Sequence, residues 1–390
     1  MKTRDDVIHQ SGCAIRHRLD KKRGMNHASA DKEIDLFGKD MTTRSILGLL
    51  YILRGMSAIG EQTEPALAKF GLKLDQLDPS ARIHRDFELK VYIELSHHLG
   101  TPHAGLKVGQ YFSLAGYGPF VMLLMTCQTI GEAFRVGVAY QALTFLFSRL
   151  HVEYDDQAAQ TAIVLAPYEA LDDKARRFLV DCEMAGTFKL LRDLQATFVD
   201  VSEQVRVEMP IDTPSDPEVL LAYQQYYGRD VSFGHRVGRF WASQSLLDKG
   251  LVTADSAGHA LYLKQCQHAL RLQQSCQTTL ADHIRAYLLL HDGEVPDIQT
   301  TARAFDMVER TLRYRLKQLG VSFRQLRDEI LYQKTQQYLT NPQMSVEQIA
   351  EKLGYAESAA LIHAFKRWSG MTPHRFRQTK AAETQAYFGA

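Results

Sequence analysis

The strongest restriction on the fold lies in residues 281–390, where a short helix, a tight turn and a second helix are predicted twice. In the clearer copy, Ser345 and Gln348 stand three residues apart and predict a capping box at the start of the first helix. Gly354 supplies the left-handed backbone that such a turn requires. The apolar residues between them recur at helical spacing: Val346, Ile349, Ala350 and Leu353. These signals predict a helix-turn-helix unit.

The second helix of this unit has two unlike faces. Leu361, Phe365 and Trp368 are predicted to be buried, and Gly370 followed by Pro373 ends the helix. In a helix-turn-helix unit the second helix lies in the major groove of DNA, so we expect the other face to contact bases. That face consists of Ser358, Ala359, Ile362, His363 and Lys366.

The first copy, residues 300–320, has the same arrangement with a more basic outer face. Leu312, Leu316 and Leu319 are predicted to point inward. The outer face consists of Arg310, Arg313, Tyr314 and Lys317. An arginine can bond both acceptors of a guanine in the major groove, which discriminates against other bases by roughly 1–3 kcal/mol.

One longer helix separates the two copies. Ser322 and Gln325 predict another capping box, and Asn341 with Pro342 ends the helix after about Leu339. Its ~18 residues span ~27 Å at a rise of about 1.5 Å per residue. With the flanking helices, that length could hold two reading helices about one DNA turn, ~34 Å, apart on one face of the duplex.

Four further arginines lie beside the two units, and each has two interpretations. Arg324, Arg327, Arg375 and Arg377 could bind phosphates, although arginines on helix surfaces more often make only local pairs. We take Arg375, together with Arg367 of the second unit, as additional DNA-binding candidates.

The net charge of the chain, +1 from 46 Lys+Arg and 45 Asp+Glu, conceals an uneven distribution. Residues 281–390 carry about +3, residues 41–280 about −4 and residues 1–40 the remaining +2. A mildly basic C-terminal module beside an acidic one is compatible with phosphate contact at one end only, although a +3 segment is more often just a solvated surface.

The rest of the chain predicts an α+β domain in which helices dominate. Residues 1–40 lack apolar periodicity and are expected to be a disordered head, in which Met25 or Met41 is an alternative start to Met1. Residues 41–274 form the α+β sensing and dimerisation domain, and residues 275–390 an all-α domain with both helix-turn-helix units. Helices are predicted from Ser45 onward, over 88–98, 129–147 and 173–194 and near 265–279, and strands over 150–154, 161–166 and 205–209.

Composition and missing motifs exclude several classes of protein. Five cysteines, an odd number with no C-x-x-C pair, suit a reducing cytosol. No apolar run reaches the ~18 residues of a membrane helix and no signal peptide is visible, so we expect a cytoplasmic protein without membrane contact. Hydrolase, P-loop, zinc-peptidase and dinucleotide motifs are absent, so we expect no catalytic residues and no cofactor. His97, His98 and His103 lack a Cys or carboxylate at ligand spacing, so we expect solvated histidines and no metal site.

One aromatic segment is a candidate for an effector pocket. Tyr111, Phe112, Tyr117 and Phe120 lie close together beside glycines. Such residues can line a binding site, yet aromatics beside glycine usually serve packing. Both interpretations stay open, and we name the four as effector-binding candidates.

Two stretches of the sequence carry a family resemblance. Matches to a long pattern occur at Ile349-Ala350, Leu353 to Tyr355, Phe365 to Trp368, Gly370, Thr372-Pro373 and Phe376-Arg377. This pattern resembles the tail of the DNA-binding domain in the AraC/XylS family of bacterial transcription regulators. Less specifically, residues 72–145, with DPSARIHRDFELK, GLKVGQYFSLAGYGP and TIGEAFRVGVAYQ, and the later YYGRDVSFGH resemble the arabinose-binding-like N-terminal domain of the subgroup with ornithine-utilisation regulators.

The resemblance implies a function. It implies a sequence-specific regulator that binds double-stranded promoter DNA through two helix-turn-helix units and whose N-terminal domain senses an effector and dimerises. Because most of the family recruits RNA polymerase, we expect an effector-responsive activator that acts as a homodimer. The alternatives are a regulator held by a partner protein instead of a small molecule, and an enzyme with an appended DNA-binding tail.

Four positions of the two reading helices depart from the family's pattern, as do Leu331 and Thr335 on the connecting helix, where the family often has Arg and Ala. Val308 and Ala356 stand where the family usually has a serine cap at the start of a reading helix, and the loss of a capping oxygen typically costs ~1 kcal/mol. Tyr314 and His363 stand at positions that are often arginine. We therefore expect weaker helix starts or other caps, and the base preference does not carry over.

Overall fold

The computed structural model describes residues 43–388 apart from residue 102 and segments 168–170, 196–204 and 275–278. The predicted head, with the alternative starts Met1, Met25 and Met41, lies outside the described residues.

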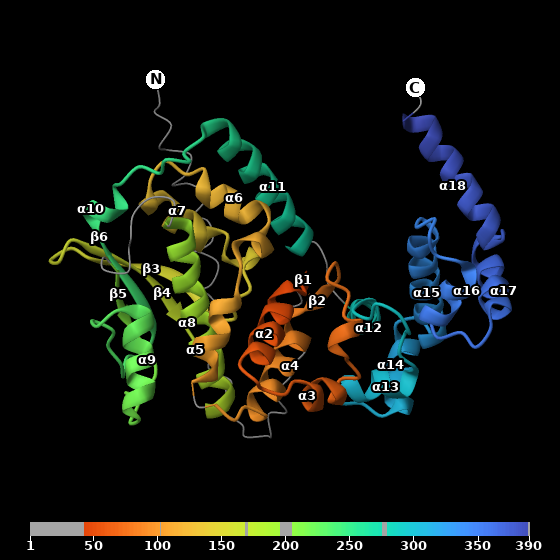
Figure 1. The fold of residues 1–390 in the computed structure, drawn as a ribbon, viewed down its shortest axis with the longest axis horizontal. Coiled ribbons are helices and arrows are strands. Elements are labelled where there is room, and N and C mark those ends of the chain that lie inside the picture. Colours follow the sequence, from red (N-terminus) through yellow and green to blue (C-terminus); the bar gives the residue numbers. More distant parts are fainter. Residues whose placement is uncertain (1–42, 102, 168–170, 196–204, 275–278, 389–390) are drawn as a thin grey trace, which may run out of the picture. The chain divides into compact units, whose positions relative to one another are not determined.

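The N-terminal part, up to Gln274, is α+β with helices dominating, as predicted (Figure 1). Its α-helices are α2 (Leu47–Ala58), α3 (Glu64–Lys69), α4 (Arg85–His97), α5 (Ala104–Val108), α6 (Pro119–Met125), α7 (Ile130–Ala139), α8 (Asp173–Gln195), α9 (Pro217–Tyr227), α10 (Gln244–Leu247) and α11 (Ser256–Gln274). Short 3-10 turns are η1 (Leu74–Gln76), η2 (Gly109–Tyr111), η3 (Leu114–Tyr117) and η4 (Gln141–Leu143). Two short strands, β1 (Thr43–Ser45) and β2 (Arg82–His84), pair antiparallel.

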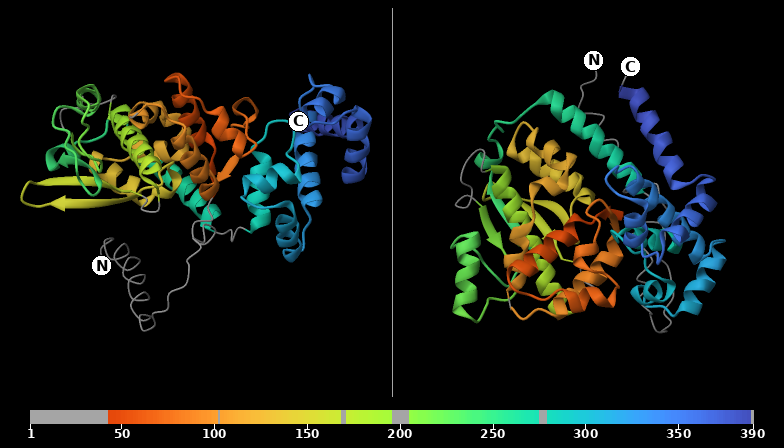
Figure 2. Two further views of the ribbon diagram at one scale, coloured as in Figure 1. Left: turned by 90° about the horizontal axis from the view of Figure 1, so that it is seen from below. Right: turned by 45° about the vertical axis from the view of Figure 1, so that its right-hand side comes forward.

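A four-stranded antiparallel sheet in the order β3-β4-β6-β5 supports the middle of this part. Its strands are β3 (Arg149–Asp155), β4 (Gln160–Ala166), β5 (Val205–Glu208) and β6 (Gly238–Ser243). Helix α8 packs on the sheet, and its Phe188 shares an apolar cluster with Ile163 and Phe240. Figure 2 shows the β3–β4 hairpin extending past the neighbouring helices. The three predicted strands and the helix at 173–194 are thus confirmed, and β6 was not predicted.

The helix predicted over 129–147 is too long, because α7 ends at Ala139. The Gln141 side chain pairs with the backbone of Leu150 at the start of β3: its amide donates to the carbonyl at 3.0 Å, and its oxygen accepts from the N–H at 2.7 Å. This contact turns the chain from the helix into the sheet. The last helix of the region, α11, also begins earlier than predicted, at Ser256.

The C-terminal part is all-α, as predicted. Its helices are α12 (Leu280–Leu289), α13 (Ile298–Ala304), α14 (Glu309–Gln318), α15 (Phe323–Leu339), α16 (Val346–Lys352), α17 (Ser358–Ser369) and α18 (Pro373–Phe388). Both predicted capping boxes are present, at Ser322 with Gln325 and at Ser345 with Gln348. Gly354 has the expected left-handed backbone, with φ 78°. No helix among the described residues is long and apolar enough to cross a membrane.

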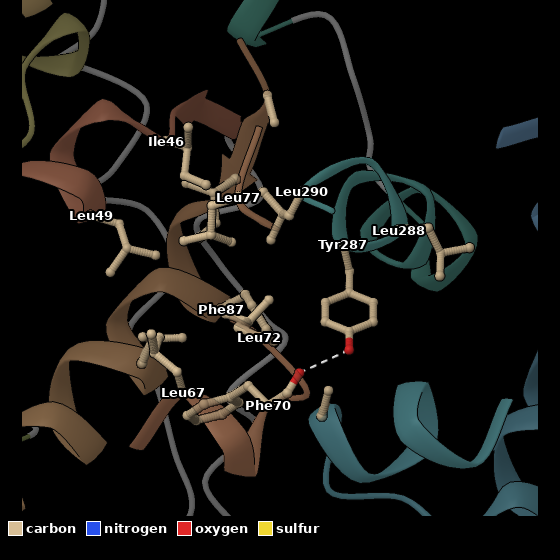
Figure 3. Packing of buried hydrophobic residues seen from close by; sticks show 14 of the residues in the cluster. Ile46, Leu49, Leu67, Phe70, Leu72, Leu77, Phe87, Tyr287, Leu288 and Leu290 are labelled. Carbon is tan, nitrogen blue, oxygen red and sulfur yellow. Dashed lines mark hydrogen bonds between the residues drawn. The ribbon is translucent and has the colours of Figure 1, made fainter. Parts of the chain in front are cut away.

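One apolar cluster joins residues of α2–α4 to residues of α12–α17. Figure 3 shows the part of it where α2–α4 meet α12. Phe87 of α4 stacks on Phe305 with ring centroids 5.6 Å apart, and it meets Tyr287 of α12 edge-on at 5.4 Å. The Tyr287 hydroxyl donates a hydrogen bond of 2.8 Å to the carbonyl of Phe70. The core of the C-terminal part therefore continues into α2–α4.

Two histidines stack in the same contact. His84 of β2 and His283 of α12 have ring centroids 3.7 Å apart and planes only 7° from parallel. Burial, and then the nearby charge of His283, lowers the pKa of His84 to about 4. Burial also lowers the pKa of His283.

The stack predicts a loss of stability in mild acid. Since His84 ordinarily has a pKa of 6.5, the unfolded chain binds a proton between pH 6.5 and 4 that the folded chain does not. We therefore expect the free energy of unfolding to decrease as the pH is lowered from 6.5 to 4, by up to roughly 3 kcal/mol for His84. Urea unfolding at several pH values measures it.

The His84→Phe variant is the matched control, because it keeps a ring for His283 to stack on and removes the titrating group. The free energy of unfolding of this variant should depend less on pH. Part of the dependence should remain, because buried His291 also has a pKa of about 4. Identical pH profiles for the two proteins would contradict the assignment.

Candidate nucleic-acid interface

The first helix-turn-helix unit consists of α13 and α14. The turn between them contains Asp306 in the left-handed region, with φ 53°. Helix α14 buries Leu312 and Leu316 completely. Leu319 does not point inward as predicted: it is the C-cap residue beyond the last turn, and it is 43% exposed.

The outer face of α14 has the predicted composition. Its four predicted residues are all exposed: Arg310, Arg313, Tyr314 and Lys317. Val308 is the N-cap residue, as expected from the departure noted in the sequence, and its side chain makes no capping hydrogen bond. The same side chain is 68% exposed, so it adds an apolar group to this face that the sequence did not single out.

Arg313 is held in place by its own helix. Its guanidinium lies 2.6 Å from the carboxylate of Glu309, one turn earlier. An exposed pair of this kind contributes little stability, so it can open without much cost when a stronger acceptor arrives. Arg313 is therefore oriented along the outer face but still available for a base.

The second unit consists of α16 and α17. Helix α17 buries Leu361 and Phe365 completely, whereas Trp368 is only half-buried. Its N-cap residue is Glu357, one position later than the expected Ala356, because the backbone turns into the helix only at Ser358. No side chain caps this helix, so the expected weaker start remains.

The predicted reading face of α17 is accessible. Ala359, His363 and Lys366 are exposed, and Ser358 and Ile362 are half-exposed. Arg367 is 53% exposed and lies 3.3 Å from Asp328 of α15, a pair that is open to solvent. This face is less basic than that of α14 and offers more apolar surface.

A polar contact that the sequence did not indicate connects the two units. Asp292, between α12 and α13, accepts hydrogen bonds from the Tyr338 hydroxyl at 2.6 Å and from Lys352 at 3.0 Å. Tyr338 belongs to α15 and Lys352 to α16, so one carboxylate joins three elements. Buried Lys334 of α15 also donates to the carbonyl of His291, beside Asp292.

These contacts hold α15 and α16 against the segment that precedes the first unit. The connecting helix α15 has 17 residues and is therefore about 25 Å long at about 1.5 Å per residue. Asp292 lies 46 residues from Tyr338 and 60 from Lys352, too far for any local pattern to reveal the contact.

The four flanking arginines divide into two groups. Arg327 donates to the carbonyl of Val295 at 3.2 Å, and Arg377 donates to the carbonyls of Leu339 at 3.2 Å and Met344 at 2.7 Å. These two arginines brace the fold. Arg324 and Arg375 are exposed and form no ion pair with any described residue.

This division predicts opposite effects for neighbouring substitutions. Arg377→Ala leaves two carbonyls without their donor, so we expect the free energy of unfolding to fall by about 1–3 kcal/mol. Arg375→Ala should change it by less than about 0.5 kcal/mol and should instead weaken binding to any DNA alike. Denaturant titration and DNA titration of both variants test this. A destabilised Arg375 variant with unchanged DNA binding would reverse the assignment.

The aromatic candidates for an effector site form one cluster around Phe145. Tyr117 lies 4.6 Å from Phe145 between ring centroids, Phe112 lies 6.1 Å from it, and Tyr117 lies 6.4 Å from Phe120. These rings are buried, whereas Tyr111 is half-buried against Gly55.

The three histidines do not form a common site. His97 lies 3.1 Å from Asp172, and His98 lies 3.4 Å from Glu94. Across the described part of the chain, no group of three His, Cys, Asp or Glu residues could hold a metal ion.

Comparison with known proteins gives two family matches. Residues 60–251 match the model described as "Arabinose-binding domain of AraC transcription regulator, N-term", and residues 301–379 match the model described as "Helix-turn-helix domain".

Relatives of the chain span both regions. The "Uncharacterized HTH-type transcriptional regulator Rv1395" of Mycobacterium tuberculosis is 29% identical over 277 residues, which is 70% of this chain and 77% of that protein. The "Ornithine utilization regulator" of Pseudomonas aeruginosa is 25% identical over 280 residues, 72% of this chain and 79% of that protein. The crystal structure of transcriptional regulator CdpR from Pseudomonas aeruginosa aligns with 25% identity and a TM-score of 0.39, covering 74% of this chain and 90% of that one.

Proposed function

The chain belongs to the AraC/XylS family of transcription regulators, and on this premise we propose that it is an effector-responsive activator that binds promoter DNA as a homodimer in the cytoplasm. The observation that carries the proposal is the pair of accessible reading faces, on α14 and α17, joined by the single helix α15. Two reading helices held by one connecting helix can enter successive major grooves, which would give one chain a long and specific site.

The two reading faces have different proposed roles. The face of α14, with Arg310, Arg313 and Lys317, offers the donors that guanine and phosphate accept. The face of α17 offers Ala359, Ile362 and His363, a set suited to thymine methyls and to positioning contacts. Arg367 and Arg375 are assigned to phosphates, and recruitment of RNA polymerase is assigned to the DNA-bound dimer.

Effector control is proposed for the N-terminal domain. The apolar contact of α2–α4 with α12 and Phe305 supports it, because a ligand that moves α2–α4 would also act on the helices that precede α14. Control by a partner protein is the alternative, and it predicts that no small molecule stabilises the chain.

The decisive experiment compares DNA from upstream of the protein's own gene with a shuffled duplex of equal length at the same salt concentration. We expect tighter binding to the upstream DNA, by about 1,000-fold or more for a specific site. The logarithm of the binding constant should fall with the logarithm of the salt concentration, by about 0.9 per neutralised phosphate. Equal affinity for both duplexes would overturn the proposal.

A further inference from the structure

We propose that the N-terminal domain binds a small organic acid with an apolar tail, in two adjoining cavities that we name the basic cavity and the apolar cavity. The inference rests on the proposed effector response and names its ligand. The basic cavity has a volume of about 410 Å³ and lies among β1, β2, the η3–α6 segment and α11. The apolar cavity, of about 110 Å³, lies among α6, α7, α8 and the sheet.

Both charged side chains that line the basic cavity are positive. Arg44 of β1 and Arg82 of β2 both line it, and its lining among the described residues contains no Asp or Glu. A cavity with two guanidinium groups and no carboxylate on its surface favours an anionic group on the ligand.

Arg44 is buried and only partly satisfied. It is 6% exposed, its Nε lies 2.5 Å from Glu88, and one terminal nitrogen donates to the carbonyl of Leu146 at 3.1 Å. The other terminal nitrogen, Nη2, is buried without a hydrogen-bond partner. A buried donor without an acceptor is unfavourable, so a shift of the Arg44 guanidinium that brings Nη2 to the cavity surface would let a ligand oxygen accept its hydrogen bond.

Two further groups in the lining can bind a carboxylate directly. Arg82 is exposed, and it donates hydrogen bonds to Thr43 and to no carboxylate of the described residues. Tyr117 lines both cavities, and its hydroxyl forms no hydrogen bond with any described residue. These donors and Arg44 come from three separate elements that border the same cavity.

The two cavities share a wall. Tyr117, Phe120 and Thr144 line both of them, so the two cavities lie side by side, and a movement of these side chains would let a molecule with its carboxylate in the basic cavity extend its tail into the apolar cavity. Beyond the wall the lining is almost wholly apolar: of its described side chains only Tyr117, Thr144 and Thr187 carry a hydrogen-bonding group. Burial of an alkyl or aryl tail there is favourable by the hydrophobic effect.

This chemistry disfavours other effectors. A sugar carries hydroxyls on every side, and most of them would lose their hydrogen bonds to water in the apolar cavity. A cationic amino acid such as ornithine would place its ammonium groups near Arg44 and Arg82 or in apolar surroundings, and both are unfavourable.

The site is close to the contact with the C-terminal part. Arg82 stands two residues before His84 on β2, and His84 stacks on His283 of α12. A ligand that draws Arg82 toward the basic cavity acts on the strand that touches α12. Binding of the acid should therefore change the affinity for promoter DNA.

The test uses the full chain and measures thermal shift and calorimetric binding with matched probes. Octanoate has both parts of the proposed ligand, octanol lacks the carboxylate and acetate lacks the tail. Arabinose and ornithine represent the disfavoured classes. We expect octanoate to raise the melting temperature by mass action and to bind at least about tenfold more tightly than octanol or acetate.

Two variants examine the two cavities separately. Arg82→Gln removes an exposed charge and should weaken octanoate by about tenfold without changing octanol. Gly137→Leu places a side chain in the apolar cavity, where an added Cβ meets only Leu124, at 3.9 Å, so the helix should fold normally. It should weaken octanoate and octanol alike. Arg206→Gln, on β5 away from both cavities, is the control for a lost surface charge.

Each outcome decides one claim. If octanoate does not bind, or if octanol binds as tightly, the organic-acid site is wrong. If arabinose or ornithine stabilises the chain instead, effector control stands and the assigned ligand class fails. If octanoate binds in the predicted way but leaves the affinity for promoter DNA unchanged, the site stands and the proposed effector response fails.

Discussion

The Arg313→Ala variant is expected to bind its promoter site about 5- to 150-fold more weakly than the parent, with a much smaller loss on shuffled DNA. The range corresponds to the roughly 1–3 kcal/mol that a bidentate arginine–guanine contact contributes to discrimination. The reason is geometric: Arg313 is 61% exposed on the outer face of α14, and among the described residues it pairs only with Glu309, a weak exposed contact.

The matched control for this variant is Arg315→Ala. Arg315 is exposed on the same helix and carries the same charge, but two residues further on it points about 200° away from Arg313. Fluorescence anisotropy with promoter and shuffled duplexes at one salt concentration separates the two effects. If Arg313→Ala and Arg315→Ala lose affinity equally, and equally on both duplexes, then Arg313 contributes only charge and reads no base.

The Phe87→Ala variant should cause the largest loss of stability among the substitutions considered. Phe87 is 6% exposed and contacts the rings of Phe70, Tyr287 and Phe305. Removing a buried aromatic ring typically lowers the free energy of unfolding by about 3–5 kcal/mol. Phe70 lies in the N-terminal part, whereas Tyr287 and Phe305 lie in the C-terminal part. The variant should therefore also weaken any effect of a ligand of the N-terminal domain on DNA binding.

Tyr287→Phe is the control for this prediction. It keeps the ring that packs on Phe87 and removes only the hydroxyl that donates to Phe70, so we expect a loss of about 1 kcal/mol. Urea unfolding followed by circular dichroism measures both variants. A Phe87→Ala variant no less stable than Tyr287→Phe would mean that the aromatic contact contributes little to folding.

The helix-turn-helix units could be predicted from the sequence because their signals are local. The capping boxes at Ser322 and Ser345, the turn at Gly354 and the stripe of Ile349, Ala350 and Leu353 each involve residues within a few positions of one another. A prediction from local spacing failed at the end of a helix. Leu319 continues the apolar stripe of α14 in the sequence, but the helix ends at Gln318, and the Leu319 side chain is exposed.

The sequence predicted which faces of the C-terminal helices are exposed, but it did not predict what each arginine beside those faces does. Arg375 and Arg377 lie two residues apart and look alike in the sequence. Arg377 braces the carbonyls of Leu339 and Met344, more than thirty residues away, whereas Arg375 is exposed. No spacing rule distinguishes them, because the difference depends on which distant carbonyls face each side chain.

The sequence by itself determined the family, the two reading helices and the α+β character of the N-terminal part, since caps, turns and apolar periodicity act over less than two helical turns. The tertiary structure decided which arginines are available, that α2–α4 and α12 share one core, and that Arg44, Arg82 and Tyr117 border one cavity. Those three residues are separated by dozens of positions along the chain. Burial and cavities are made by contacts between distant segments, so they exist only once the chain has folded.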